Sequence, residues 1–134
     1  MPEKRDGLYI FEGLTQKEIS YFVMMSEVKK FASGTKIISE GNATDNRAYL
    51  IESGSVDVYR QKVKIDSLHT GDIFGEMALI TDEPRSATVI ANSPVEVLIF
   101  NKNEFLILCK KSGLYDDIKW KILRRVKENF YENN

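Results

Sequence analysis

Residues 74–89 have the types and spacing that best suit the binding of an anion. They read FGEMALITDEPRSATV, and residues 77–80 are good helix formers in a run too short to be stable alone. One helical turn here would direct the free backbone N–H groups of its first residues, Glu76 to Ala78, outward. Such a helix end attracts anions, and phosphate is the usual one.

Polar side chains in the same segment complete a set that suits a phosphorylated sugar. Arg85 follows Glu76 by nine positions, and its forked guanidinium complements phosphate oxygens. Pro84 restricts the backbone before Arg85, Ser86 adds a hydroxyl, and Glu76 can accept a hydrogen bond from a sugar hydroxyl. Two simpler interpretations stay open, namely that Glu76 and Arg85 form an internal ion pair and that Gly75 only serves a tight turn.

Composition excludes several other classes of protein. The chain has 134 residues, the size of one domain, and 19 basic against 20 acidic residues give a net charge of −1. This balance argues against a strong overall field toward nucleic acid or an anionic membrane. One cysteine, Cys109, and one histidine, His69, exclude a disulfide framework and make a metal centre improbable. The chain has no apolar run long enough for a membrane span and no signal-peptide core, so we expect a cytoplasmic protein without metal or cofactor.

The periodicity of the chain predicts helices at both ends of a β-rich region. Thr15 and Glu18 fit a capping box for a helix over about residues 15–26. Short β-type runs with turn residues at intervals of about ten positions occupy residues 28–100, which favours an antiparallel barrel, sandwich or jelly roll. Asn101 or Asn103 can cap a helix that ends near residue 113, and a last helix is expected over about residues 115–131.

Residues 75–89 resemble a known motif. The run GEMALITDEPRSATV is similar to the phosphate-binding cassette of cyclic nucleotide-binding domains, found in protein kinase A regulatory subunits, cyclic-nucleotide-gated channels and the catabolite activator protein. Gly34, Gly41, residues 49–56 and residues 71–74 match the surroundings of that cassette, and the resemblance covers about residues 10–132. It implies a mainly β fold, an antiparallel β-roll of jelly-roll type over about residues 28–100. An N-terminal helix and C-terminal B and C helices (about 102–131) would flank the roll in one domain, 1–134.

The resemblance also implies the roles of individual residues. Glu76 would bind the ribose 2′-hydroxyl and Arg85 the cyclic phosphate. The backbone N–H groups of Met77 and Ala78 would join the phosphate site, and Gly75 would allow close approach. No catalytic residue is implied.

Recognition of the base is less defined. Ser86 would lie near the phosphate and the base, at a position that is often Ala in cAMP sensors and Thr in cGMP sensors. Serine is compatible with both, and we favour cAMP over cGMP. Ile65 and Leu68 look like apolar walls for the base, or else are ordinary core residues.

The function implied is that of a non-catalytic receptor that signals by movement of its C-terminal helix, residues 115–131, toward an unknown output protein. Trp120, Leu123 or Tyr131 would supply a lid over the purine, or else pack in the core or in a dimer. The apolar stripe of that helix either pairs in a homodimer or lies on its own roll; its members are Ile118, Ile122, Val126 and Phe130. The basic residues between 119 and 127 are read as a solvated face, so no nucleic-acid or membrane contact by this chain is expected.

Two other functions remain as alternatives. The chain could be the effector half of a transcription regulator of the catabolite-activator type, or an interaction module with a vestigial pocket.

Overall fold

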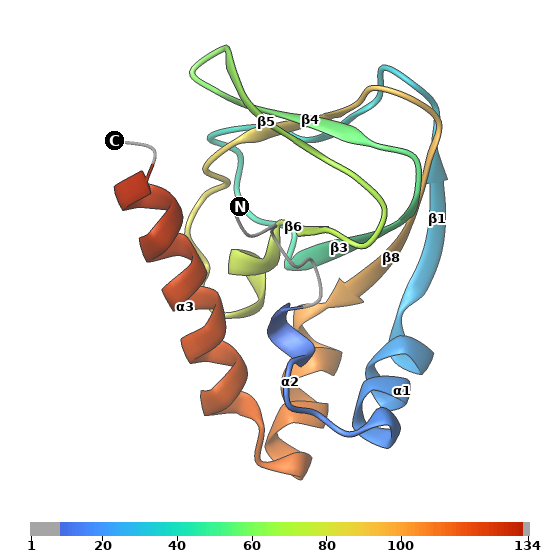
Figure 1. The fold of residues 1–134 in the computed structure, drawn as a ribbon, viewed down its shortest axis with the longest axis vertical. Coiled ribbons are helices and arrows are strands. Elements are labelled where there is room, and N and C mark those ends of the chain that lie inside the picture. The colour runs from blue at the N-terminus through green and yellow to red at the C-terminus, as the bar shows by residue number, and fades with distance from the viewer. Residues whose placement is uncertain (1–8, 133–134) are drawn as a thin grey trace.

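The computed structural model describes the backbone of residues 9–132 and the side chains of residues 9–127. Short 3-10 helices η1 and η2 and helices α1–α3 accompany eight strands. The chain order is η1 Tyr9–Phe11, α1 Gln16–Met25, β1 Glu27–Phe31, β2 Lys36–Ile38, β3 Arg47–Ser53, β4 Val56–Arg60, β5 Val63–Leu68, β6 Ile73–Phe74, η2 Glu76–Leu79, β7 Thr88–Ala91, β8 Val95–Asn101, α2 Lys102–Ser112 and α3 Tyr115–Glu132. The helices gather at one end of the strands, and α3 runs along one side of the roll (Figure 1).

The strands form two antiparallel four-stranded sheets. One sheet has the order β1-β8-β3-β6 and the other the order β2-β7-β4-β5. In the first sheet Leu50 of β3 pairs with Leu98 of β8, and in the second Val56 of β4 pairs with Ala91 of β7. This architecture confirms the predicted fold class, a mainly β antiparallel roll with flanking helices.

Strand β8 is buried on both faces because it lies between two cores. Val97 and Ile99 contribute to the core between the sheets, whereas Leu98 and Phe100 pack against the helices. A strand covered on both sides reads as a continuous apolar run, which explains why residues 95–100 show little alternation. In the core between this strand and the helices, Phe22 of α1 packs against Phe105 of α2, and their ring centroids are 5.2 Å apart.

The helix boundaries follow their predicted caps. The Thr15 hydroxyl accepts from the Glu18 N–H at 3.1 Å, and the Glu18 carboxylate accepts from the Thr15 N–H at 2.8 Å. Asn101, rather than Asn103, caps α2, since its side chain accepts from the Asn103 N–H at 2.9 Å. Gly113 ends that helix with φ of 75°.

Two of the strands lack the alternation of buried and exposed residues that marks a half-buried strand. Strand β1 carries mostly exposed side chains at a sheet edge, and β6 has only two residues, so neither shows a distinct alternating pattern. Across residues 9–132, no helix combines the length and the apolarity that crossing a bilayer would require.

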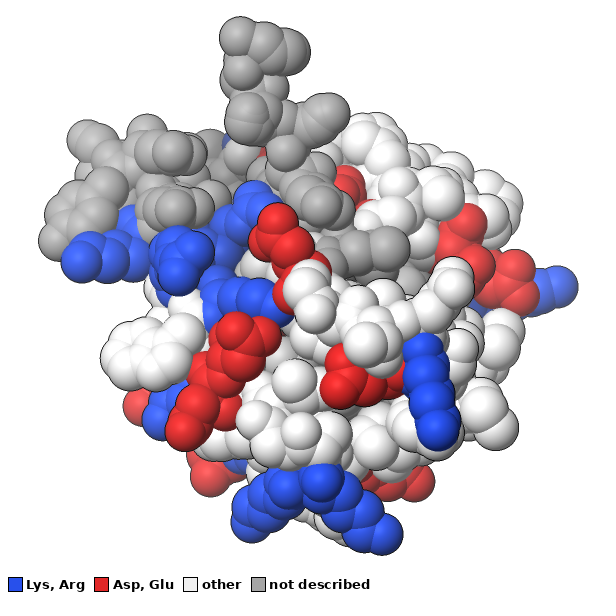
Figure 2. Space-filling model, turned by 60° about the horizontal axis from the view of Figure 1, so that its bottom comes forward, with Lys and Arg blue, Asp and Glu red and all other residues white. Residues whose placement is uncertain are grey.

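The apolar stripe of α3 packs largely on its own protomer. Ile118 and Ile122 are fully buried in the core beneath the helices, which leaves neither available for pairing with a second copy. Val126 is partly exposed, and the side chain of Phe130 lies outside the described residues. Figure 2 shows the helical end of the molecule, where acidic side chains lie between the basic ones. Of the five basic residues between 119 and 127, Arg124 and Lys127 are exposed, whereas Lys119, Lys121 and Arg125 are partly buried, so only part of this set forms a solvated face.

Candidate functional site: a cavity between the η2 turn and helix α3

A cavity of about 420 Å³ opens between the η2 turn, the β-roll and helix α3. Its volume lies within the range of roughly 300–1,000 Å³ that is usual for small-molecule sites. All six residues predicted for the phosphate and the ribose line it, namely Gly75, Glu76, Met77, Ala78, Arg85 and Ser86. The structure therefore brings the two halves of the segment, the η2 turn and the residues around Arg85, to one cavity.

Gly75 creates the turn from which this site is built. Its φ is +73°, a left-handed conformation that side chains with a Cβ rarely adopt. A Cβ at this position would lie 3.1 Å from Nη1 of Arg85 and 3.1 Å from Cδ1 of Ile38. Glycine thus satisfies both the backbone angle of the turn and the close approach of the guanidinium.

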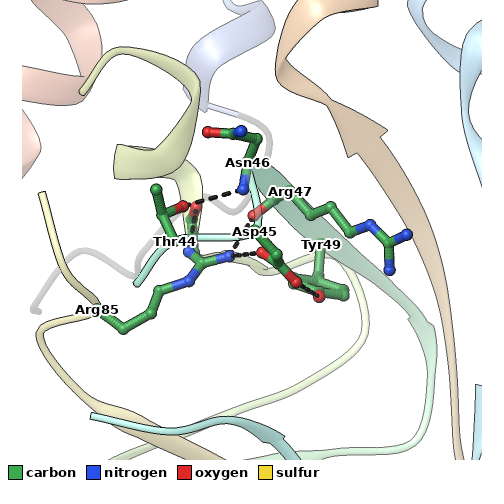
Figure 3. Close-up of polar contacts among 7 residues, drawn as sticks. Thr44, Asp45, Asn46, Arg47, Tyr49 and Arg85 are labelled. Atoms are coloured by element: carbon green, nitrogen blue, oxygen red, sulfur yellow. Dashed lines mark hydrogen bonds and ion pairs between the residues drawn. The ribbon is translucent and has the colours of Figure 1, made fainter. Parts of the chain in front are cut away.

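The Arg85 side chain is almost completely enclosed, with 8% exposure, and is held by three oxygens. Nη1 donates to the Gly75 carbonyl at 3.2 Å, and Nη2 donates to the Arg47 carbonyl at 2.8 Å. Nη2 also forms an ion pair with Oδ1 of Asp45 at 2.6 Å (Figure 3). A guanidinium has five N–H donors, so these three bonds fix its position and leave donor capacity for an anion.

The simpler interpretation of an ion pair between Glu76 and Arg85 is therefore wrong. Arg85 takes Asp45 as its partner, and Glu76 accepts a hydrogen bond from the Tyr9 hydroxyl at 2.7 Å. The two carboxylates come from different segments, since Asp45 lies in the loop before β3 and Glu76 begins η2.

Asp45 is a site residue that the sequence reasoning missed, because an acidic residue in a polar loop carries no distinguishing spacing. It also accepts from the Tyr49 hydroxyl at 3.4 Å. Burial raises the pKa of Tyr49, and the negative charge of Asp45 raises it further. The Tyr49 ring stacks on Phe74 with centroids 5.0 Å apart, and this contact holds β3 against β6.

The backbone of the η2 turn corrects one detail of the prediction. The Ala78 N–H was expected to point outward unpaired, but it donates to the Gly75 carbonyl at 3.2 Å. The turn is a 3-10 helix, whose i→i+3 bonds use the N–H group of its third residue. Ala78 still lines the cavity, though its N–H group already has a partner.

Helix α3 reaches the cavity through residues other than the predicted lid. Arg125 and Val126 line it, and Trp120 does not, because its side chain is 63% exposed on the outer side of the helix. Leu123 is half-buried and is likewise absent from the described lining. The side chain of Tyr131 lies outside the described residues.

The predicted apolar walls for the base also lie elsewhere. Leu68 is buried in the core between the sheets, and Ile65 is exposed on β5, so neither is among the described residues that line the cavity. The side chains that do contribute from the roll include Arg60 at the end of β4 and Val89 of β7. Leu68 therefore fits the alternative interpretation of an ordinary core residue, whereas Ile65 fits neither interpretation.

No group of three or more potential metal ligands occurs within the described part of the chain. Cys109 is fully buried in α2, and burial raises the pKa of its thiol to about 12, so it stays protonated at neutral pH. The backbone N–H of His69 donates to the Asp72 carboxylate in the turn that precedes β6.

Comparison with known proteins agrees with this geometry. Residues 28–112 match the family described as the cyclic nucleotide-binding domain. A cAMP-dependent protein kinase regulatory subunit of Hypocrea atroviridis is 42% identical over 96 residues, which are 72% of this chain and 21% of that protein. A cGMP-dependent protein kinase of Plasmodium berghei is 35% identical over 100 residues, 74% of this chain and 12% of the kinase.

Two solved structures share the fold. The catabolite activator protein of Thermus thermophilus has a TM-score of 0.82 and 27% identity, covering 92% of this chain and 61% of that one. The cAMP-bound PfPKA-R has a TM-score of 0.79 and 24% identity, covering 95% of this chain and 42% of that one. This chain thus spans only about a fifth or less of the two curated relatives. With its cassette, its roll and its family match in agreement, the chain belongs to the cyclic nucleotide-binding domain family.

Proposed function

We propose that this chain is a non-catalytic cAMP receptor in the cytoplasm and that the cavity beneath α3 is its nucleotide site. The observation that carries the proposal is the enclosed Arg85 guanidinium, held at the cavity by Gly75, Arg47 and Asp45. A fixed, largely desolvated cation is the group that a cyclic phosphate requires. Glu76 lies in the same lining and would accept the ribose 2′-hydroxyl.

The preference for cAMP over cGMP rests on relatedness. Ser86 lines the cavity next to Arg85 and has a small hydroxyl side chain that accepts either purine. The relative at 42% identity is named for cAMP, whereas the cGMP-dependent kinase is at 35%. We therefore assign cAMP as the preferred ligand and cGMP as the nucleotide against which that preference is measured.

The signal would pass to an output protein through α3. Arg125 and Val126 place this helix directly at the cavity, so a bound nucleotide would contact it. A ligand shifts such an element only if it binds one position of the helix more tightly than another. The nucleotide would therefore stabilise one placement of α3 on the roll.

The test is isothermal titration calorimetry with cAMP and with cGMP on the wild-type chain and on three variants. Arg85→Ala removes charge-assisted bonds worth roughly 1.5–3 kcal/mol each, so affinity should fall about tenfold to more than a hundredfold. Arg85→Lys keeps the charge but not the forked guanidinium, so its affinity for the nucleotide should fall less. Arg124→Ala is the matched control, because Arg124 is exposed on α3 and outside the described lining.

Tighter binding of cAMP than of cGMP by the wild-type chain, with Arg124→Ala unchanged, is the expected result. Equal affinity of the wild type and Arg85→Ala would refute the phosphate role of Arg85. No heat with either nucleotide would refute the receptor and favour an interaction module with a vestigial pocket.

A further inference from the structure

Tyr9 of η1 connects the N-terminal part of the chain to the ribose end of the cavity. Its hydroxyl donates to Oε2 of Glu76 at 2.7 Å, across 67 positions of sequence. The side chain is buried, with 8% exposure, and its neighbours Ile10 and Phe11 belong to the core beneath the helices. The hydroxyl therefore reaches Glu76 from a buried part of the fold.

A second contact holds the ring of Tyr9 from helix α3. The Arg125 guanidinium lies over this ring, 4.6 Å from its centroid, in a cation–π arrangement. Arg125 and Glu76 both line the cavity. One aromatic side chain thus touches the carboxylate at the start of η2 and the helix α3 at the same time.

The chemistry of this contact favours orientation of the carboxylate over blocking of it. An ionised carboxylate has two oxygens and about four lone-pair sites, so it can accept the Tyr9 hydroxyl and other donors at the same time. A hydrogen bond to a charged acceptor is also stronger than a neutral one. A Glu side chain held in this way loses rotamer freedom before a ligand arrives, which lowers the cost of binding.

We propose that Tyr9 is a positioning residue for sugar recognition: it holds the Glu76 carboxylate in the orientation that accepts the ribose 2′-hydroxyl. The inference rests on the proposed function, since it assigns a supporting residue to the same cavity. It makes Tyr9 specific for the sugar hydroxyl and leaves phosphate binding to Arg85.

The test compares cAMP with 2′-deoxy-cAMP, which lacks the hydroxyl that Glu76 would bind. Calorimetry on Tyr9→Phe should show affinity for cAMP lowered on the order of tenfold, the effect of one hydrogen bond to a charged group. Affinity for 2′-deoxy-cAMP should stay the same, so the preference for the ribonucleotide shrinks. Tyr21→Phe is the matched control, because Tyr21 is an exposed tyrosine of α1.

A double-mutant cycle separates positioning from general structural support. In a Glu76→Gln background the loss of the Tyr9 hydroxyl should no longer change the ratio of the two affinities. Thermal unfolding of each variant verifies that it is folded.

Two outcomes would overturn the inference. Equal losses for both nucleotides in Tyr9→Phe would mean that Tyr9 only supports the fold. An unchanged ratio with unchanged affinities would mean that the hydrogen bond does not position Glu76. Both leave the proposed function standing, whereas failure of the wild-type chain to bind cAMP and cGMP refutes the proposed function itself.

Discussion

The Arg85 guanidinium and the Asp45 carboxylate form an ion pair at 2.6 Å that joins residues 40 positions apart. The pair is asymmetric, since Arg85 is 8% exposed whereas Asp45 is 50% exposed. Asp45 therefore provides the counter-charge for a nearly buried cation while facing solvent itself. In the proposed nucleotide site, this arrangement would keep Arg85 in place before a phosphate binds.

Replacing Asp45 by Asn should destabilise the ligand-free chain by about 1 kcal/mol, because the enclosed guanidinium loses its charged partner. Urea unfolding measures this loss. Bound cAMP should restore part of it, because its phosphate supplies a new negative charge. Asp82→Asn is the control, since Asp82 is 85% exposed in its ion pair with Lys102 and should matter less. Equal stability of Asp45→Asn and the wild type would contradict a supporting role for Asp45.

Gly75→Ala should lower both stability and affinity for cAMP. The left-handed conformation alone costs roughly 1–2 kcal/mol for a residue with a Cβ, and the new methyl group would crowd Nη1 of Arg85. Gly13→Ala is a matched control, because Gly13 has φ of +88° and a Cβ there would meet nothing within 4 Å. Denaturant unfolding and calorimetry on both variants should show a larger loss, and the affinity loss, only at Gly75. Similar behaviour of the two variants would show that crowding at Arg85 is unimportant.

Thr15→Ala should destabilise the chain by about 1 kcal/mol, because the substitution removes the side-chain acceptor of the Glu18 N–H in the capping box. Ser20→Ala offers a comparison on the same helix, since the Ser20 hydroxyl only bonds back to the Gln16 carbonyl. Chemical denaturation monitored by circular dichroism measures both. Losses of equal size would argue that the cap contributes nothing beyond the general effect of removing a hydroxyl.

Cys109 should resist alkylation by iodoacetamide at pH 8 while the chain is folded, and should react once urea unfolds it. The thiolate is the reactive form, and burial raises the pKa of this thiol to about 12. Because the pKa is raised on folding, the stabilisation is present below the unfolded-state pKa and is lost as the pH rises toward 12. Rapid labelling of the folded chain would show that α2 opens readily.

Local features of the sequence predicted the helices and most of the strands, and the resemblance of residues 75–89 identified the cassette. The Thr15 cap lies three residues from the group that it satisfies, so that helix start could be predicted from spacing, whereas spacing left Asn101 and Asn103 as alternative caps for the next helix. The segment from Gly75 to Ser86 contains six predicted site residues, and all of them line the cavity. The left-handed backbone at Gly75 is a local reason for the glycine before the short turn.

Only the tertiary structure decided which residues complete the site. The partner of Arg85 is Asp45, that of Glu76 is Tyr9, and the helix residues at the cavity are Arg125 and Val126. These contacts span 40 residues or more, and no periodicity records which loop or helix face closes on a given turn. Local hydrogen bonding sets the form of each segment, but the burial of two apolar cores determines how the segments meet, and it places Leu68 in the core and leaves Ile65 outside the described lining of the cavity.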